Sequence, residues 1–476
     1  MNVLAIDQGT TSTKAHVLFD DGRFETVGGI AHQQHFPGPG RVEHDAGEIA
    51  AAVETLIGRA VAAHGVPDAV ALANQGETVV AWDRDTRQPL HRAIVWQDQR
   101  TQPRLDGFGA AQKALVAERA GLPLDAYFSA SKLAWLLREV PEVAAAAAAG
   151  RLGLATSDVF LLGRLTGRYA TDAATASRTS LMDLDRRCWD GDLAALFGVP
   201  LALLPPILPC AGDFGPVQIG GAERPLTASL VDQQAALYGH GCRAAGDAKI
   251  TFGTGTFALA VSGPVPVRGR EGLVPTLAWQ LPGEAALYAL DAGDFTAAAA
   301  IGWGRSLGLP MDGALGPGPS AIERGLVFVP ALAGLAAPHW DRGAGGLFLG
   351  LRQDTTPADM ARAIWEGIAL RAVELLEALI GADAAGAVSV DGGLTHDDGF
   401  VQFLADALGR PARRRASADL TALGVAMLGF VGLGAEPPPV STAGDRLVEP
   451  SAAGAAIRDA RPLFARAVER SKGWFG

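Results

Sequence analysis

An apolar run near the start of the chain ends in residues that could bind a metal ion and a phosphate. Residues 3–6 are apolar, Asp7 follows them, and residues 9–12 read Gly-Thr-Thr-Ser before Lys14. Hard divalent cations take oxygen ligands, so Asp7 could hold one with its hydration water. Glycine and hydroxyl residues offer N–H and O–H donors to an anion at short range. The stretch is a candidate site for a phosphate tail and its metal, although a plain polar hairpin turn would have the same composition.

A second tip of the same kind lies in the middle of the chain. Residues 249–252 read as a strand, Gly253-Thr254-Gly255-Thr256 follows, and residues 257–261 read as another strand. The construction resembles the opening hairpin. Two such hairpins, one at the head of each half, suggest a duplicated architecture with a cleft between the halves. We therefore expect two domains, residues 1–245 and 246–476.

Two further stretches complete a set that could transfer a phosphoryl group. Asp232 stands where an apolar strand end meets a helix, and a carboxylate facing a cleft there can accept a hydroxyl proton. Asp391-Gly392-Gly393 turns a strand towards a helix that begins near Asp398. Phosphoryl transfer needs donors for the phosphates, a carboxylate for the metal and a base beside the accepting hydroxyl. Taken one at a time, Asp232 could be a helix cap and the glycines could be plain turns. The order in which all of these residues occur along the chain favours phosphoryl transfer.

The elements that must position these residues alternate between strands and helices. Asp45 can cap a helix with apolar positions at 49, 53, 57 and 61, and residues 69–73 form an apolar strand of the kind found inside a sheet. Thr356-Pro357-Ala358-Asp359 is a strong helix start, and we expect that helix to run to Ile380 and stop at Gly381. Small residues in 420–426 would let a helix pack closely over a strand or ligand.

Composition excludes several classes of protein. With 476 residues, 49% hydrophobic and 19% charged, the chain is a well-packed globular protein, and its net charge of −11 argues against nucleic-acid binding. Three dispersed cysteines without a CxxC pair indicate reduced thiols and no zinc site. The start of the chain has no signal-peptide pattern and no apolar run is long enough for a membrane span, so we expect a cytoplasmic protein. P-loop, protein-kinase and dinucleotide-binding motifs are absent.

Over nearly its whole length the chain resembles the FGGY carbohydrate kinases, and within them the glycerol-kinase-like branch. Residues 7–12 look like the first phosphate loop of the family, and residues 232–237 match the stretch that holds its catalytic aspartate. Residues 41–45 and 93–97 look like glycerol-kinase segments. The two diagnostic patterns of the family are similar to residues 127–135 and to residues 346–351 together with Asp359 and Glu366.

The resemblance implies an α/β fold of two actin-like, ribonuclease-H-type domains, each a mixed β-sheet flanked by helices, hinged about a central cleft. It implies transfer of the γ-phosphoryl group of ATP to a terminal hydroxyl of a small polyol or sugar, with Mg²⁺ as cofactor and a homo-oligomer, dimer or tetramer, as the assembly. Asp232 would be the catalytic base, and Asp7 and Asp232 would hold the metal. The nucleotide would be bound by Thr10, Thr11, Ser12, Lys14, Gly253, Thr254, Gly392, Gly393, Leu394 and Asp397. The acceptor would be bound by Gly76, Glu77, Trp96, Tyr127, Asp232, Gln233 and Phe257.

Three positions depart from the glycerol-kinase pattern. Gly76 replaces an arginine, Val231 replaces a glycine, and Asp397 stands where an asparagine is common. Without the arginine, the pocket could admit a longer polyol or a sugar, or another arginine could fill the space, with Arg100 as a nearby candidate in sequence. On this account glycerol has a high KM that falls on Gly76→Arg.

Three alternatives remain. The chain could be a kinase of a larger sugar such as a ketopentose, an actin-like ATP-binding module that acts through partner interaction, or a catalytically silent relative. A module that only binds partners has no need for a pocket containing Glu77, Trp96, Tyr127 and Gln233. The presence of both Asp7 and Asp232 argues against a silent protein.

Overall fold

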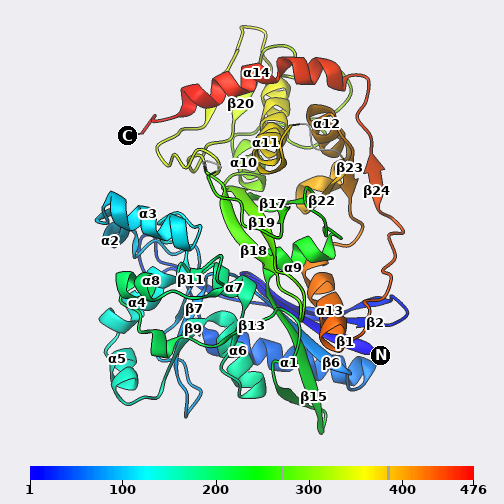
Figure 1. Ribbon diagram of the computed structural model, residues 1–476. Coiled ribbons are helices and arrows are strands. Elements are labelled where there is room, and N and C mark those ends of the chain that lie inside the picture. The colour runs from blue at the N-terminus through cyan, green and yellow to red at the C-terminus, as the bar shows by residue number, and fades with distance from the viewer. Residues whose placement is uncertain (270–271, 383–385, 476) are drawn as a thin grey trace.

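Two large mixed sheets carry the polar tips (Figure 1). The computed structural model describes residues 1–269, 272–382 and 386–475. In the first sheet the order is β14-β15-β6-β1-β2-β3, with β1, β2 and β3 antiparallel and β6 and β15 added in parallel beside β1. Its strands are β1 (Asn2–Gln8), β2 (Ser12–Phe19), β3 (Phe24–Ala31), β6 (Ala69–Asn74), β14 (Pro216–Ile219) and β15 (Ala222–Val231).

The second sheet repeats this topology. Its order is β18-β19-β17-β16-β22-β23-β24; β16 pairs antiparallel with β17, β17 with β19, and β22 and β23 continue in parallel on the other side of β16. The predicted duplication and the α/β fold with mixed sheets are confirmed. The strands are β16 (Ala248–Phe252), β17 (Thr256–Gly263), β18 (Val274–Trp279), β19 (Leu287–Asp294), β22 (Val388–Asp391), β23 (Ala412–Arg414) and β24 (Arg446–Val448).

A smaller five-stranded sheet and several short helices lie beside the first sheet and share their own apolar core (Figure 1). Its order is β4-β5-β8-β7-β9, and three two-stranded pairs complete the strands. The remaining strands are β4 (Gln34–His35), β5 (Glu43–His44), β7 (Val79–Asp83), β8 (Ala93–Ile94), β9 (Leu152–Thr156), β10 (Thr171–Asp172), β11 (Met182–Asp183), β12 (Cys188–Trp189), β13 (Ile207–Leu208), β20 (Val327–Val329) and β21 (Leu347–Leu349).

Helices begin and end where local signals place them. Asp45 caps α1 by accepting from the backbone N–H groups of Gly47 and Glu48. Thr356 and Asp359 form a reciprocal capping box at the start of α11, which ends at Gly381 as predicted. The helices are α1 (Ala46–His64), α2 (Gln102–Asp106), α3 (Ala110–Arg119), α4 (Ser129–Glu139), α5 (Pro141–Ala148), α6 (Ser157–Thr166), α7 (Ala173–Ser177), α8 (Gly191–Phe197), α9 (Asp232–Gly239), α10 (Ala298–Ser306), α11 (Pro357–Ile380), α12 (Asp398–Leu408), α13 (Leu420–Gly432) and α14 (Gly454–Ser471). Within the described residues, no helix is both long and apolar enough to cross a membrane.

In the chain, helix α13 lies between β23 and β24 of the second sheet, but it packs on the first sheet (Figure 1). A Cβ on Gly429 would lie 2.6 Å from Val3 Cγ1, and one on Gly424 would lie 1.9 Å from the carbonyl oxygen of Ala235 in α9. Glycine is therefore required at both close approaches. The small residues of this segment do allow the tight packing that the sequence predicted. The division of the chain near residue 245 stays a prediction, since α13 packs with the earlier residues.

Candidate active site

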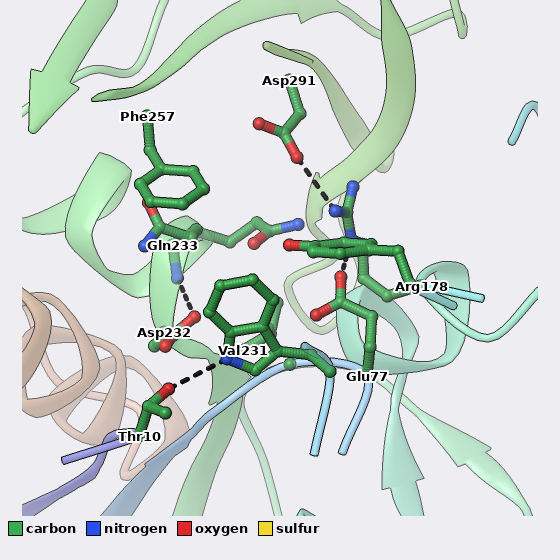
Figure 2. A pocket seen from close by; sticks show the side chains of 12 residues that line it. Thr10, Glu77, Arg178, Val231, Asp232, Gln233, Phe257 and Asp291 are labelled. Atoms are coloured by element: carbon green, nitrogen blue, oxygen red, sulfur yellow. Dashed lines mark hydrogen bonds and ion pairs between the residues drawn. The ribbon is translucent and has the colours of Figure 1, made fainter. Parts of the chain in front are cut away.

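A cavity of about 170 Å³ lies where the ends of β1, β6 and β15 meet β17 and β19 of the second sheet (Figure 2). All seven predicted acceptor residues line it, and so does Thr10 of the predicted nucleotide set. Other members of the nucleotide set lie at the neighbouring tips rather than in the cavity. The lining residues are Thr10, Gly76, Glu77, Trp96, Tyr127, Arg178, Val231, Asp232, Gln233, Gln234, Phe257 and Asp291.

Asp232 is the first residue of α9, directly after β15, and its carboxylate faces the cavity. Its Oδ1 accepts from the backbone N–H of Gln233 at 2.7 Å. Burial, together with the nearby charges of Asp7 and Glu77, raises the pKa of Asp232 to about 7. A carboxylate whose pKa is close to neutral pH is well matched to accept a proton. Val231, not Asp232, occupies the cap position of α9, so the helix-cap alternative is not what the structure shows.

Asp7 lies near the end of β1, at the base of the first tip. Burial raises the pKa of Asp7 to about 7, against the opposing effect of Lys14. Lys14 Nζ donates to Asp419 Oδ1 at 2.7 Å, which ties the first sheet to the start of α13. Mg²⁺ in kinases is held by one or two carboxylates together with substrate phosphates and water, so Asp7 and Asp232 fit such an ion. Within the described part of the chain no group of three or more metal-ligating side chains occurs.

The first tip is joined to the acceptor wall by a hydrogen bond. The backbone N–H of Gly9 donates to the carbonyl oxygen of Ser12 at 3.0 Å, which closes the turn around Thr10 and Thr11. Trp96 Nε1 donates to Thr10 Oγ1 at 3.0 Å (Figure 2). A residue predicted to bind phosphate therefore touches a residue predicted to bind the acceptor.

The second tip lies beside the glycines that follow β22. The carbonyl groups of Gly253 and Thr254 accept from backbone N–H groups at the start of α10. Gly392 has φ 96°, and a Cβ there would lie 2.3 Å from the carbonyl oxygen of Phe252. Only glycine tolerates this approach, which brings the turn at Gly393 and the buried Leu394 next to the end of β16. Asp397 is the cap of α12 and accepts from the backbone N–H of Phe400 at 2.9 Å.

Aromatic rings form the apolar wall of the cavity. The ring of Trp96 lies edge-on to Tyr127, with centroids 5.5 Å apart, and edge-on to Phe257, with centroids 6.5 Å apart. Lys132, fully buried, donates to the carbonyl oxygen of Tyr127 at 2.6 Å and so fixes that residue. Lys249 Nζ donates to Gln233 Oε1 at 2.6 Å, so the amide nitrogen of Gln233 is the end available to a ligand.

Arg178 and Asp291 line the cavity although neither was predicted from the sequence. Arg178 Nε donates to Glu77 Oε1 at 2.6 Å, and its Nη2 pairs with Asp291 Oδ2 at 2.9 Å (Figure 2). Arg100, the candidate that the sequence offered for the space beside Gly76, does not fill it. Arg100 is paired with Asp98 and Glu43 and does not line the cavity. Because the buried Asp98 lies only two residues before it, Arg100 is held in a local ion pair.

Gly76 and Val231, two of the three departures from the glycerol-kinase pattern, face each other. A Cβ on Gly76 would lie 2.9 Å from Val231 Cγ2, closer than such carbon atoms come. A Cβ at 76 would force the buried Val231 to shift, so valine at 231 favours glycine at 76, and the two departures compensate. The next residue, Glu77, has φ 55°, a left-handed conformation that is strained for a residue with a side chain. Its ion pair with Arg178 helps to hold that conformation.

The chain belongs to the FGGY family of carbohydrate kinases. The N-terminal domain model of this family matches residues 2–239, and the C-terminal domain model matches residues 248–433. These matches confirm the family resemblance, the kinase class and the two-domain α/β fold predicted from the sequence.

Among its relatives, the glycerol kinase of Thermus brockianus is 42% identical, with 99% of each chain covered. The glycerol kinase of Dechloromonas aromatica is 43% identical, with 99% of this chain and 98% of the relative covered. The crystal structure of Plasmodium falciparum glycerol kinase with ADP superimposes with a TM-score of 0.89 at 27% identity, covering 99% of this chain and 98% of that one.

Proposed function

We propose that the protein transfers the γ-phosphoryl group of ATP to a terminal hydroxyl of glycerol or a similarly small polyol. The observation that carries this proposal is the position of Asp232, whose carboxylate faces a cavity lined by hydroxyl-binding side chains and linked to the Thr10 tip. The names of its relatives support the same acceptor. Val231 occupies the space beside Gly76, which favours a small polyol over a ketopentose.

In this mechanism the acceptor hydroxyl lies against Asp232 and between the apolar wall of Trp96 and Phe257 and the polar groups of Glu77 and Gln233. Its oxygen attacks the γ-phosphorus, the bond to ADP breaks, and the hydroxyl proton passes to the Asp232 carboxylate. The backbone and hydroxyl donors of the two tips, at Thr10 and Thr254, would hold the phosphates. Asp7 and Asp232 would hold Mg²⁺, which would neutralise charge on the phosphates.

The test is an ADP-release assay over glycerol, tetritols, pentitols and ketopentoses, with mass spectrometry of the products. We expect phosphorylation of glycerol or a tetritol and slow ATP hydrolysis without an acceptor, because closure around the acceptor excludes water. ADP release that does not depend on any polyol or sugar would refute the proposal. Light scattering would test the predicted homo-oligomer, a dimer or tetramer.

A further inference from the structure

The acceptor cavity contains a guanidinium group that the mechanism above does not use. Arg178 directly follows α7, and only 5% of its side chain is exposed. Glu77 accepts from its Nε, and Asp291 of the second sheet pairs with its Nη2 (Figure 2). A planar guanidinium held at two edges cannot turn without losing both partners. Its remaining nitrogen therefore has a fixed direction.

That remaining nitrogen, Nη1, is buried and has no hydrogen-bond partner among the residues that the structure describes. Buried donors are nearly always satisfied by protein, water or ligand. Arg178 lines the cavity, so a molecule bound there is the natural partner of Nη1.

Position 76 leaves this role to Arg178. A side chain at position 76 would collide with Val231, of which only 2% is exposed. Glycine at position 76 contributes no side-chain donor, and the buried Val231 disfavours a larger residue there.

The charges in the cavity indicate which acceptors it takes. Three carboxylates, those of Glu77, Asp232 and Asp291, and one guanidinium line it. Burial opposes the charge of Arg178, but Glu77 and Asp291 raise its pKa above the ordinary value, so it stays charged. An acceptor with its own carboxylate or phosphate would meet an excess of negative charge. A neutral hydroxyl can accept from Nη1 without that repulsion.

We propose that Arg178 is a specificity-determining residue that donates from Nη1 to a hydroxyl of the acceptor and thereby selects neutral polyols over sugar acids and sugar phosphates. The inference rests on the proposed function and deepens it. It assigns the acceptor-binding guanidinium to a residue about a hundred positions from Glu77 in the chain.

The test compares the wild type with Arg178→Lys, which keeps the charge but not the fork. The acceptors are glycerol, glycerate and the two propanediols, each of which lacks one hydroxyl of glycerol. We expect kcat/KM for glycerol to fall about ten- to hundredfold, mainly through KM, because one charged hydrogen bond is lost. One of the two diols lacks the hydroxyl that Arg178 contacts, and for that diol the kcat/KM of the wild type and of Arg178→Lys should agree within about twofold. The KM for ATP should also agree within about twofold between the two enzymes.

Arg100→Lys is the matched control. Arg100 is equally buried and paired with two carboxylates, but it lies outside the cavity. Its replacement should affect glycerol and both diols equally. If Arg178→Lys also affects all three equally, or none, or if the wild type prefers glycerate, the assignment of Arg178 is overturned. A wild type inactive on glycerol and on tetritols would instead overturn the proposed function itself.

Discussion

The contact between Gly76 and Val231 predicts an energetic coupling that a double-mutant cycle can measure. In Gly76→Ala the new Cβ would lie 2.9 Å from Val231 Cγ2, and overpacking of this kind costs about 1–3 kcal/mol of the free energy of unfolding. Val231→Ala removes two buried methyl groups and costs about 2 kcal/mol. The double variant removes the collision, so it should be more stable than the sum of the single effects by about 1–3 kcal/mol.

The free energies of unfolding would come from urea titrations monitored by tryptophan fluorescence. The KM of each variant for the acceptor would be measured alongside. Gly58→Ala in α1 is the control, because a Cβ there meets nothing within 4 Å and should stabilise the helix by about 0.5–1 kcal/mol. Additive effects at 76 and 231, to within about 0.5 kcal/mol, would refute the reasoning.

The same contact changes what the sequence alone predicted for Gly76→Arg. The arginine should raise, not lower, the KM for glycerol while Val231 is present. Combined with Val231→Gly it should enter the cavity and lower that KM. A single Gly76→Arg variant with improved glycerol KM would show that the valine moves aside.

Other predictions concern the proton acceptor and the nucleotide side of the site. Asp232→Asn removes the base, so turnover should fall at least about a hundredfold while binding of a fluorescent ADP analogue is unchanged; appreciable turnover would exclude that role. Burial raises the pKa of Asp232 to about 7, and only the ionised carboxylate accepts a proton. We therefore expect kcat/KM to rise about tenfold per pH unit up to about pH 7 and then level off, and a flat pH profile would contradict this. Gly392→Ala would bring a Cβ within 2.3 Å of the Phe252 carbonyl oxygen and should lower the free energy of unfolding by more than about 1 kcal/mol. Its control is Gly393→Ala, which has open space around the new Cβ and should cost less than about 0.5 kcal/mol. Equal losses in urea titrations would contradict this prediction.

Features set by local chemistry could be predicted from the sequence. The capping pair Thr356 and Asp359 and the glycine at 381 fix both ends of α11, because the atoms that satisfy a helix terminus lie within a few residues of it. The strand–tip–strand pattern likewise predicted both hairpins and the duplicated sheets.

Features set by distant residues could not be predicted in this way. Arg178 reaches Glu77 across about a hundred residues, and no nearby pattern distinguishes it from other arginines, so the nearer Arg100 was chosen wrongly. The departures at 76 and 231 were both visible, but the way in which they compensate depends on a distance that only the fold supplies.

The position of α13 has a consequence for how the chain folds during synthesis. Its Gly429 lies against Val3 and Ala71 of the first sheet, and Thr227 Oγ1 donates to the carbonyl oxygen of Gly429 at 2.9 Å. Strands made early on the ribosome therefore keep an uncovered apolar face until more than 400 residues have been translated. A message cut short before this helix would yield a protein whose first sheet is prone to aggregate, however complete its catalytic groups.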